Sequence, residues 1–204
     1  MRTFIAIELA DTQRAWLARI CGEHADRTRE IRWTPPERMH ITLAFLGDVA
    51  PAQFDDACAI AGDACRRLPP FDLRLANFGV FPDHRKPRVL WCGVACNPET
   101  PHRWVDAVRR PLQHIGIAMD ERDLVPHVTL ARAKSPAAQR ALRQIFLKLW
   151  ESPTVCDADG VAVPIAPALC DAPAHHVPEL VVFESKLLPN GPRYTSRARI
   201  PLGG

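Results

Sequence analysis

The sequence predicts a mixed α+β fold whose two halves resemble each other in outline. Segments with the two-residue period of strands alternate with segments of helical period along the chain. The short pattern His-x-Thr-Leu occurs twice, at 40–43 and at 127–130, and each copy lies in a strand-like segment followed by a helix-like one. This repetition favours a weak internal duplication.

Each expected element has a local reason. Asp11 is a suitable helix cap, and Pro51 and Pro136 stand where a first helical turn tolerates proline. The strand segments are rich in β-branched and aromatic residues and are bounded by glycine or proline. In order, we expect a strand at 3–9, a helix at 11–27, a strand at 39–46, a helix at 51–68, strands at 71–81 and 88–96, a helix at 101–115, a strand at 127–132, a helix at 136–150, and strands at 179–185 and 193–200.

Bulk composition indicates one globular domain over residues 1–204. Hydrophobic residues make up 47% of the chain and charged residues 24%, with a net charge of +3, which excludes a basic nucleic-acid coat. The seven cysteines form no CxxC pair, so neither a disulfide framework nor a zinc ribbon is expected. No apolar run approaches the roughly 20 residues of a membrane span. These features predict a cytoplasmic protein, and we expect a monomer with no membrane partner and no cofactor.

One segment departs from the regular alternation. Residues 151–178 contain many prolines and alanines and show no clear period. We expect a long loop or an insertion there.

The two His-x-Thr strands carry the chemistry that the sequence predicts. Side chains alternate along a strand, so His40 and Thr42 share one face, while Leu43 and Phe45 fall on the opposite face, which we expect to be core. The same alternation places His127 and Thr129 together. If the two strands are neighbours, two imidazoles and two hydroxyls meet.

Such a set suits the opening of a cyclic phosphodiester without a metal. One imidazole can take a proton from water and the other can protonate the leaving ribose oxygen. The threonine hydroxyls can donate hydrogen bonds to the phosphate oxygens. A single strand histidine is more often structural, but the duplication argues against that interpretation. A metal site would need a third ligand, which neither motif supplies at matching spacing.

The motifs and their surroundings resemble the two-histidine phosphoesterase superfamily, and within it the bacterial and archaeal RNA 2′,3′-cyclic phosphodiesterases, which are also called 2′-5′ RNA ligases or LigT-like proteins. The similarity extends over nearly the whole chain. It rests on residues 2–7, 32–37, 43–47, 78–82, 85, 87–91, 126–132, 183–185, 191 and 194.

The resemblance implies two pseudo-symmetric lobes, each an antiparallel sheet with helices outside, and an active site in the central cleft. It implies His40 as proton donor, His127 as proton acceptor, and Thr42, Thr129 and Arg132 as ligands of the substrate phosphate. The order of the two histidines stays open. Strand parity places Arg132 away from His127, so a twist or bulge is needed to bring it to the site.

The implied reaction is hydrolysis of RNA 2′,3′-cyclic phosphate ends to 2′-phosphates, with reversible 2′-5′ ligation as an accompanying activity. The alternatives are the same chemistry on a cyclic nucleotide, a 2′-5′ oligonucleotide or an ADP-ribose cyclic phosphate, and a non-catalytic RNA-binding protein. Aromatic and basic side chains could contact RNA by stacking or along its backbone. The candidates are Phe4, Phe45, Arg85, Arg88 and Trp91.

Overall fold

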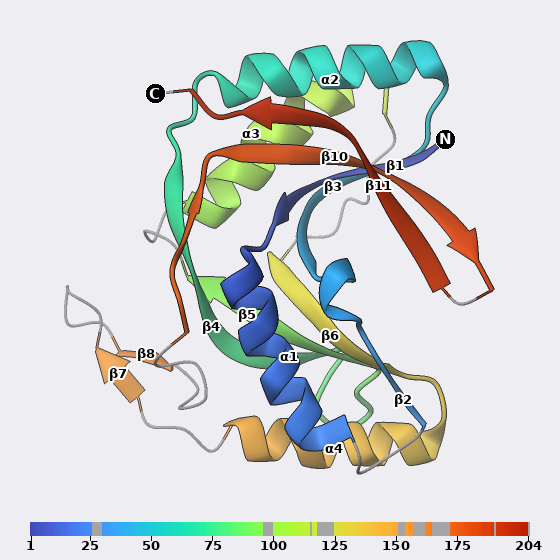
Figure 1. Ribbon diagram of the computed structural model, residues 1–204, viewed down its shortest axis with the longest axis vertical. Coiled ribbons are helices and arrows are strands. Elements are labelled where there is room, and N and C mark those ends of the chain that lie inside the picture. The colour runs from blue at the N-terminus through green and yellow to red at the C-terminus, as the bar shows by residue number, and fades with distance from the viewer. Residues whose placement is uncertain are drawn as a thin grey trace.

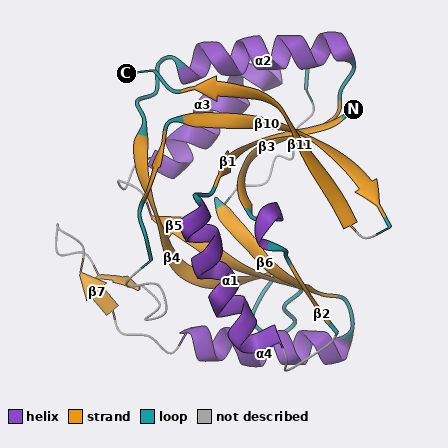
Figure 2. Ribbon diagram, in the orientation of Figure 1, coloured by secondary structure: helices purple, strands orange, loops and turns teal. Residues whose placement is uncertain are grey.

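The computed structural model confirms an α+β fold (Figures 1 and 2) and describes residues 1–25, 30–95, 100–114, 116–117, 125–150, 154–156, 162–164, 172–189 and 191–203. Its elements are β1 (Arg2–Glu8), α1 (Asp11–Ala25), β2 (Ile31–Trp33), the 3₁₀ turn η1 (Pro36–Arg38), β3 (His40–Asp48), α2 (Pro51–Cys65), β4 (Phe71–Phe81), β5 (Val89–Ala95), α3 (Thr100–His114), β6 (His127–Ala133), α4 (Pro136–Trp150), β7 (Thr154–Cys156), β8 (Ala162–Pro164), β9 (His175–Val177), β10 (Glu179–Leu188) and β11 (Gly191–Pro201).

One curled antiparallel sheet runs through both halves of the molecule. Its strands follow the order β11-β10-β1-β3-β6-β5-β4-β9, and β2 pairs with the outer part of β6. The half that ends in β3 carries α2 and α3, and the half that begins with β6 carries α1 and α4 (Figure 1). The predicted two-lobed arrangement is therefore present, with β3 and β6 side by side at its centre.

The two central strands each contain one extra residue at the same place in the repeated motif. In the pairing of β1 with β3, the register skips Leu43, and in the pairing of β5 with β6 it skips Leu130. As a result, two consecutive side chains turn into the core in each strand: Leu43 and Ala44 in β3, and Leu130 and Ala131 in β6. Such a bulge reverses the alternation of the residues that follow it. In β3 a second register shift, which skips Leu46, ends this reversal after Phe45.

This reversal corrects one prediction and confirms another. Phe45 was expected in the core, but its side chain is 53% exposed because the bulge turns it to the face that carries His40. Arg132 needed an irregularity to join the face of His127, and the bulge at Leu130 confirms that irregularity. Phe45 and Arg132 therefore occupy equivalent positions in the two halves.

Part of the segment predicted to be a loop forms strands. β9 pairs with the start of β4 and extends the sheet, and β7 pairs with β8. The prediction failed because three-residue strands are too short to show a period. Residues 151–153, 157–161 and 165–171 of this segment lie outside the described residues. The helix expected at 51–68 ends earlier, at Cys65.

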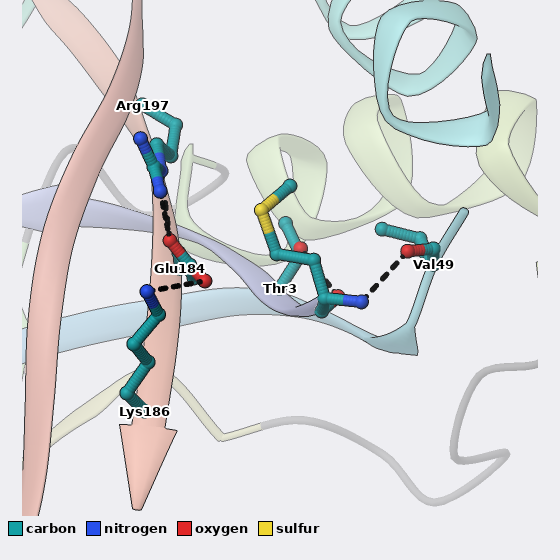
Figure 3. Close-up of polar contacts among 6 residues, drawn as sticks. Thr3, Val49, Glu184, Lys186 and Arg197 are labelled. Atoms are coloured by element: carbon teal, nitrogen blue, oxygen red, sulfur yellow. Dashed lines mark hydrogen bonds and ion pairs between the residues drawn. The ribbon is translucent and has the colours of Figure 1, made fainter. Parts of the chain in front are cut away.

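Hydrogen bonds anchor the beginning of β1 (Figure 3). The amino group of Met1 donates to the carbonyl of Val49 at 2.9 Å, and Oγ1 of Thr3 donates to the carbonyl of Met1 at 3.0 Å. Thr3 faces Glu184 across the pair of β1 with β10, and the Glu184 carboxylate accepts a hydrogen bond from Nε of Arg197 at 2.8 Å. These bonds hold the amino-terminal end of β1, the strand that pairs with β3 and so with the segment that carries His40.

Apolar side chains gather on both faces of the sheet. The large core lies between the sheet and its helices and includes the buried cysteines 21, 65 and 92. A second cluster lies on the histidine face of the first half and consists of Phe4, Ala6, Val181 and Phe183, with Tyr194 against it. Among the described residues, no helix is long and apolar enough to cross a membrane.

A substitution of Leu130, the extra residue of the bulge in β6, tests how much the core depends on that bulge. Its side chain is fully buried, so we expect Leu130→Ala to lower the free energy of unfolding by about 2–5 kcal/mol. Urea unfolding followed by circular dichroism measures the loss. Leu187→Ala is the matched control, because Leu187 is 70% exposed and its truncation should change little. Equal losses for the two variants would contradict the assignment of Leu130 to the core.

Candidate active site

The four motif side chains lie together where the two halves of the sheet join. Ile41 faces Val128 in the antiparallel pair of β3 with β6, so His40 lies opposite Thr129 and Thr42 lies opposite His127. Each imidazole therefore has a hydroxyl across from it, and the two imidazoles stand on a diagonal. Diagonal neighbours in an antiparallel pair are about 7–8 Å apart. All four side chains are half-buried.

Backbone carbonyls orient both imidazoles in the same way. Nδ1 of His40 donates to the carbonyl of Arg38 at 2.8 Å, and Nδ1 of His127 donates to the carbonyl of Val125 at 2.7 Å. A carbonyl oxygen only accepts hydrogen bonds, so Nδ1 is the protonated nitrogen in each neutral ring. Nε2 of each ring is thereby left as the atom that can take or give a proton.

The threonine of the second motif lies beside the reactive nitrogen of its own histidine. Oγ1 of Thr129 is 3.4 Å from Nε2 of His127. Because Nε2 carries no proton in the neutral ring, the hydroxyl is the donor in this contact. This arrangement favours the unprotonated state of Nε2 in His127.

Aromatic rings hold His40 from two sides. The ring centroid of Phe4 lies 4.9 Å from that of His40, and Tyr194 meets the imidazole edge-on at 5.1 Å. Phe183 stacks against Phe4 at 5.2 Å and supports it from below. These rings come from β1, β11 and β10, so three strands fix the position of one imidazole.

A second aromatic group holds His127. Phe81 meets the imidazole edge-on with centroids 5.1 Å apart, and Trp91 lies at 5.9 Å and stacks on Phe81. The indole of Trp91 covers Gly79 so closely that a Cβ at that position would overlap the ring. A glycine is therefore required at position 79 for Trp91 to reach His127.

Burial and nearby charge favour neutral imidazoles in the free protein. Burial lowers the pKa of His40, and the positive charges of His127 and Arg132 lower it further, while the bond to the Arg38 carbonyl opposes the change. Burial likewise lowers the pKa of His127, and Arg132 adds to the effect. Arg132 is thus electrostatically close to both imidazoles.

Arg132 lies at the edge of this group with its side chain exposed. Among the residues that the structure describes, no carboxylate forms a salt bridge with it. A guanidinium that is exposed beside two imidazoles is suited to bind an anion.

The five residues predicted to contact RNA differ in how accessible the structure leaves them. Phe4 is only 2% exposed, so the prediction that it stacks on a base is wrong: its ring packs under His40. Phe45 is exposed and lies 5.8 Å from Phe4, centroid to centroid. Trp91 is half-buried beside His127. Arg85 and Arg88 are exposed in or next to the turn between β4 and β5, and their RNA contacts stay predictions.

Two aromatic residues of the site were not predicted from the sequence. Phe81 and Tyr194 touch the histidines from strands that are distant in the chain. Tyr194 carries a weak signal, since it is the only tyrosine in the sequence. In the described part of the chain, no three His, Cys, Asp or Glu side chains gather as metal ligands.

Comparisons with known proteins agree with this arrangement. Residues 7–91, which include the first motif, match the family model described as LigT-like phosphoesterase. The chain is 30% identical to an RNA 2′,3′-cyclic phosphodiesterase of Thermotoga maritima over 95% of its own length and 91% of the relative. It is 29% identical to a protein of the same name from Methanothermobacter thermautotrophicus, over 96% and 95% of the two chains.

The fold is shared with a solved structure as well. A crystal structure of a Thermus thermophilus protein superposes with a TM-score of 0.75 at 26% identity, covering 100% of this chain and 99% of the other. The family model, the two relatives and the shared fold thus point to the same family. The chain belongs to the LigT-like phosphoesterase family.

Proposed function

We propose that this protein is an RNA 2′,3′-cyclic phosphodiesterase that works without a metal. The observation that carries the proposal is the pair of diagonal imidazoles whose Nδ1 atoms are held by the carbonyls of Arg38 and Val125. Both Nε2 atoms are then available on one face, on side chains that are diagonal neighbours in the strand pair. The relatives named RNA 2′,3′-cyclic phosphodiesterase support RNA ends as the substrate.

In this proposal, His127 acts as general base and His40 as general acid. Nε2 of His127 takes a proton from water as the water oxygen bonds to phosphorus. The bond from phosphorus to the ribose O3′ breaks, and Nε2 of His40 gives its proton to that oxygen, which leaves a 2′-phosphate. In the free protein the hydroxyl of Thr129 lies beside Nε2 of His127. When this hydroxyl turns to a phosphate oxygen of the substrate, the Nε2 lone pair is free to take the proton of water.

Thr42, Thr129 and Arg132 stabilise the phosphate oxygens in this scheme. Hydroxyls and a guanidinium can donate to the charge that develops during attack. The same steps, with an RNA 5′-hydroxyl in place of water as the nucleophile, would form a 2′-5′ linkage, and their reversal would cleave that linkage and close the cyclic phosphate again. We further propose that the protein acts as a monomer in the cytoplasm, and the free thiols of cysteines 21, 58, 65 and 92 are consistent with a reducing compartment.

Replacing either histidine tests the acid–base roles. His40→Asn and His127→Asn should each lower kcat by about 10²–10⁴ on a short RNA ending in a 2′,3′-cyclic phosphate, since each removes one proton-transfer group. The assay contains EDTA, and RNA binding should largely survive in both variants. His176→Asn is the control, because His176 is exposed and pairs with Asp72 away from the site. An inactive wild-type protein, or loss of its activity in EDTA, would refute the proposal.

The pH profile tests the electrostatics of the free enzyme. One imidazole must be protonated and the other neutral, so kcat/KM should be bell-shaped, falling at low pH as the base gains its proton and at high pH as the acid loses its own. Because both pKa values are lowered from 6.5, the optimum should lie below pH 6.5. Arg132→Gln removes a positive charge near both rings and should move the optimum to higher pH. An unmoved optimum in that variant would contradict the assigned role of Arg132.

The exposed ring of Phe45 is suited to stack on a base of the RNA. Stacking contributes about 1–3 kcal/mol per base, so Phe45→Leu should raise KM for RNA by roughly tenfold with little effect on kcat. Phe45→Trp should restore the wild-type KM. Trp150→Leu serves as control, because Trp150 is 50% exposed and lies on α4. If Phe45→Leu and Trp150→Leu have the same KM, Phe45 does not contact the substrate.

A further inference from the structure

Two arginine side chains from different elements meet at the beginning of β11. A Cβ on Gly191 would overlap Nη2 of Arg32 and would lie 2.6 Å from Nη1 of Arg38. Since both nitrogens lie within 2.6 Å of one point, no more than twice that distance separates them. The φ of Gly191, +108°, also requires glycine, so the backbone leaves room at this place for two guanidinium groups.

Arg132 extends this group toward the histidines. In the pair of β2 with β6, Arg32 and Arg132 stand directly opposite each other, and both are exposed. Partners across an antiparallel pair project from the same face of the sheet, so Arg32 lies on the face of His127. Two guanidinium groups that project from one face of the sheet can both donate hydrogen bonds to one bound anion.

Tyr194 connects the arginines to His40. Burial raises the pKa of Tyr194, and the nearby positive charges of Arg132, Arg38 and Arg2 oppose that rise. The same tyrosine meets the His40 ring edge-on. We call these three side chains, Arg132, Arg38 and Arg32, the arginine track. The track extends from the two imidazoles to the β10–β11 hairpin.

We propose that Arg32 and Arg38 bind the phosphate on the 5′ side of the terminal nucleotide, so that the enzyme prefers RNA chains to nucleoside 2′,3′-cyclic monophosphates. This inference rests on the proposed function. In the proposed reaction the histidines and Arg132 bind the cyclic phosphate. The next anionic group along a single RNA strand is the phosphate on the 5′ side of the terminal nucleotide. The planar forks of arginine suit phosphate oxygens, and an uncharged ribose 5′-hydroxyl would gain little from them.

The experiment compares three substrates with the same terminal base: uridine 2′,3′-cyclic phosphate, the same nucleotide with a 5′-phosphate, and a dinucleotide ending in it. Arg32→Gln should lower kcat/KM at least tenfold more for the two substrates that carry the 5′-side phosphate than for the one that lacks it. Arg193→Gln is the matched control. Arg193 precedes Tyr194 on β11, so its side chain points to the opposite face of the strand.

Salt dependence of the unaltered enzyme provides a second measurement that needs no variant. Each phosphate contact made by a single strand adds about 0.7 to the slope of log affinity against log salt. The dependence of KM on salt should therefore be steeper for the dinucleotide than for uridine 2′,3′-cyclic phosphate. Urea unfolding of Arg32→Gln shows whether the variant is folded.

The outcomes separate this inference from the proposed function. If the wild-type enzyme opens none of the three substrates, the proposed function fails. If it opens them but Arg32→Gln affects all three equally, or if their salt slopes are the same, the arginine track is not a site for the 5′-side phosphate. A selective loss in Arg32→Gln, with Arg193→Gln like the wild type and a steeper salt slope for the dinucleotide, supports it.

Discussion

The short antiparallel contact between β3 and β6 is the constraint on which the rest of the site depends. It joins the two halves of the sheet at Ile41 and Val128, and it sets which motif residues face each other. With this register, each imidazole meets a hydroxyl and the imidazoles stand on a diagonal. A shift by one residue would turn both histidines toward the core, because side chains alternate with a period of two. The apolar residues between the motif positions prevent that shift.

The two bulges, at Leu43 and Leu130, are a second constraint on the site. Each lets two consecutive apolar side chains enter the core and returns the following residue to the reactive face. The chain uses the two equivalent positions differently, with an aromatic ring at Phe45 and a guanidinium at Arg132. A symmetric scaffold thus presents an asymmetric surface, as a substrate with a base on one side and charged phosphates on another requires.

The two imidazoles have a fixed orientation and lowered pKa values. Carbonyl oxygens hold both Nδ1 atoms, and aromatic rings pack against each imidazole. The same burial that positions the rings lowers their pKa values, and Arg132 reinforces the effect. An incoming phosphate would offset the positive charge of Arg132, so binding of an anion should raise both pKa values again.

The sequence by itself determined the four helices, the main strands, and the pairing of each histidine with its threonine, because these depend on local period and alternation. It also indicated that Arg132 needs a bulge. The tertiary structure alone decided that Phe45 is exposed and Phe4 buried, since a bulge is a property of strand pairing. It alone brought Phe81 and Tyr194 to the histidines and Arg32 opposite Arg132, because contacts between strands far apart in the chain leave no periodic trace in the sequence.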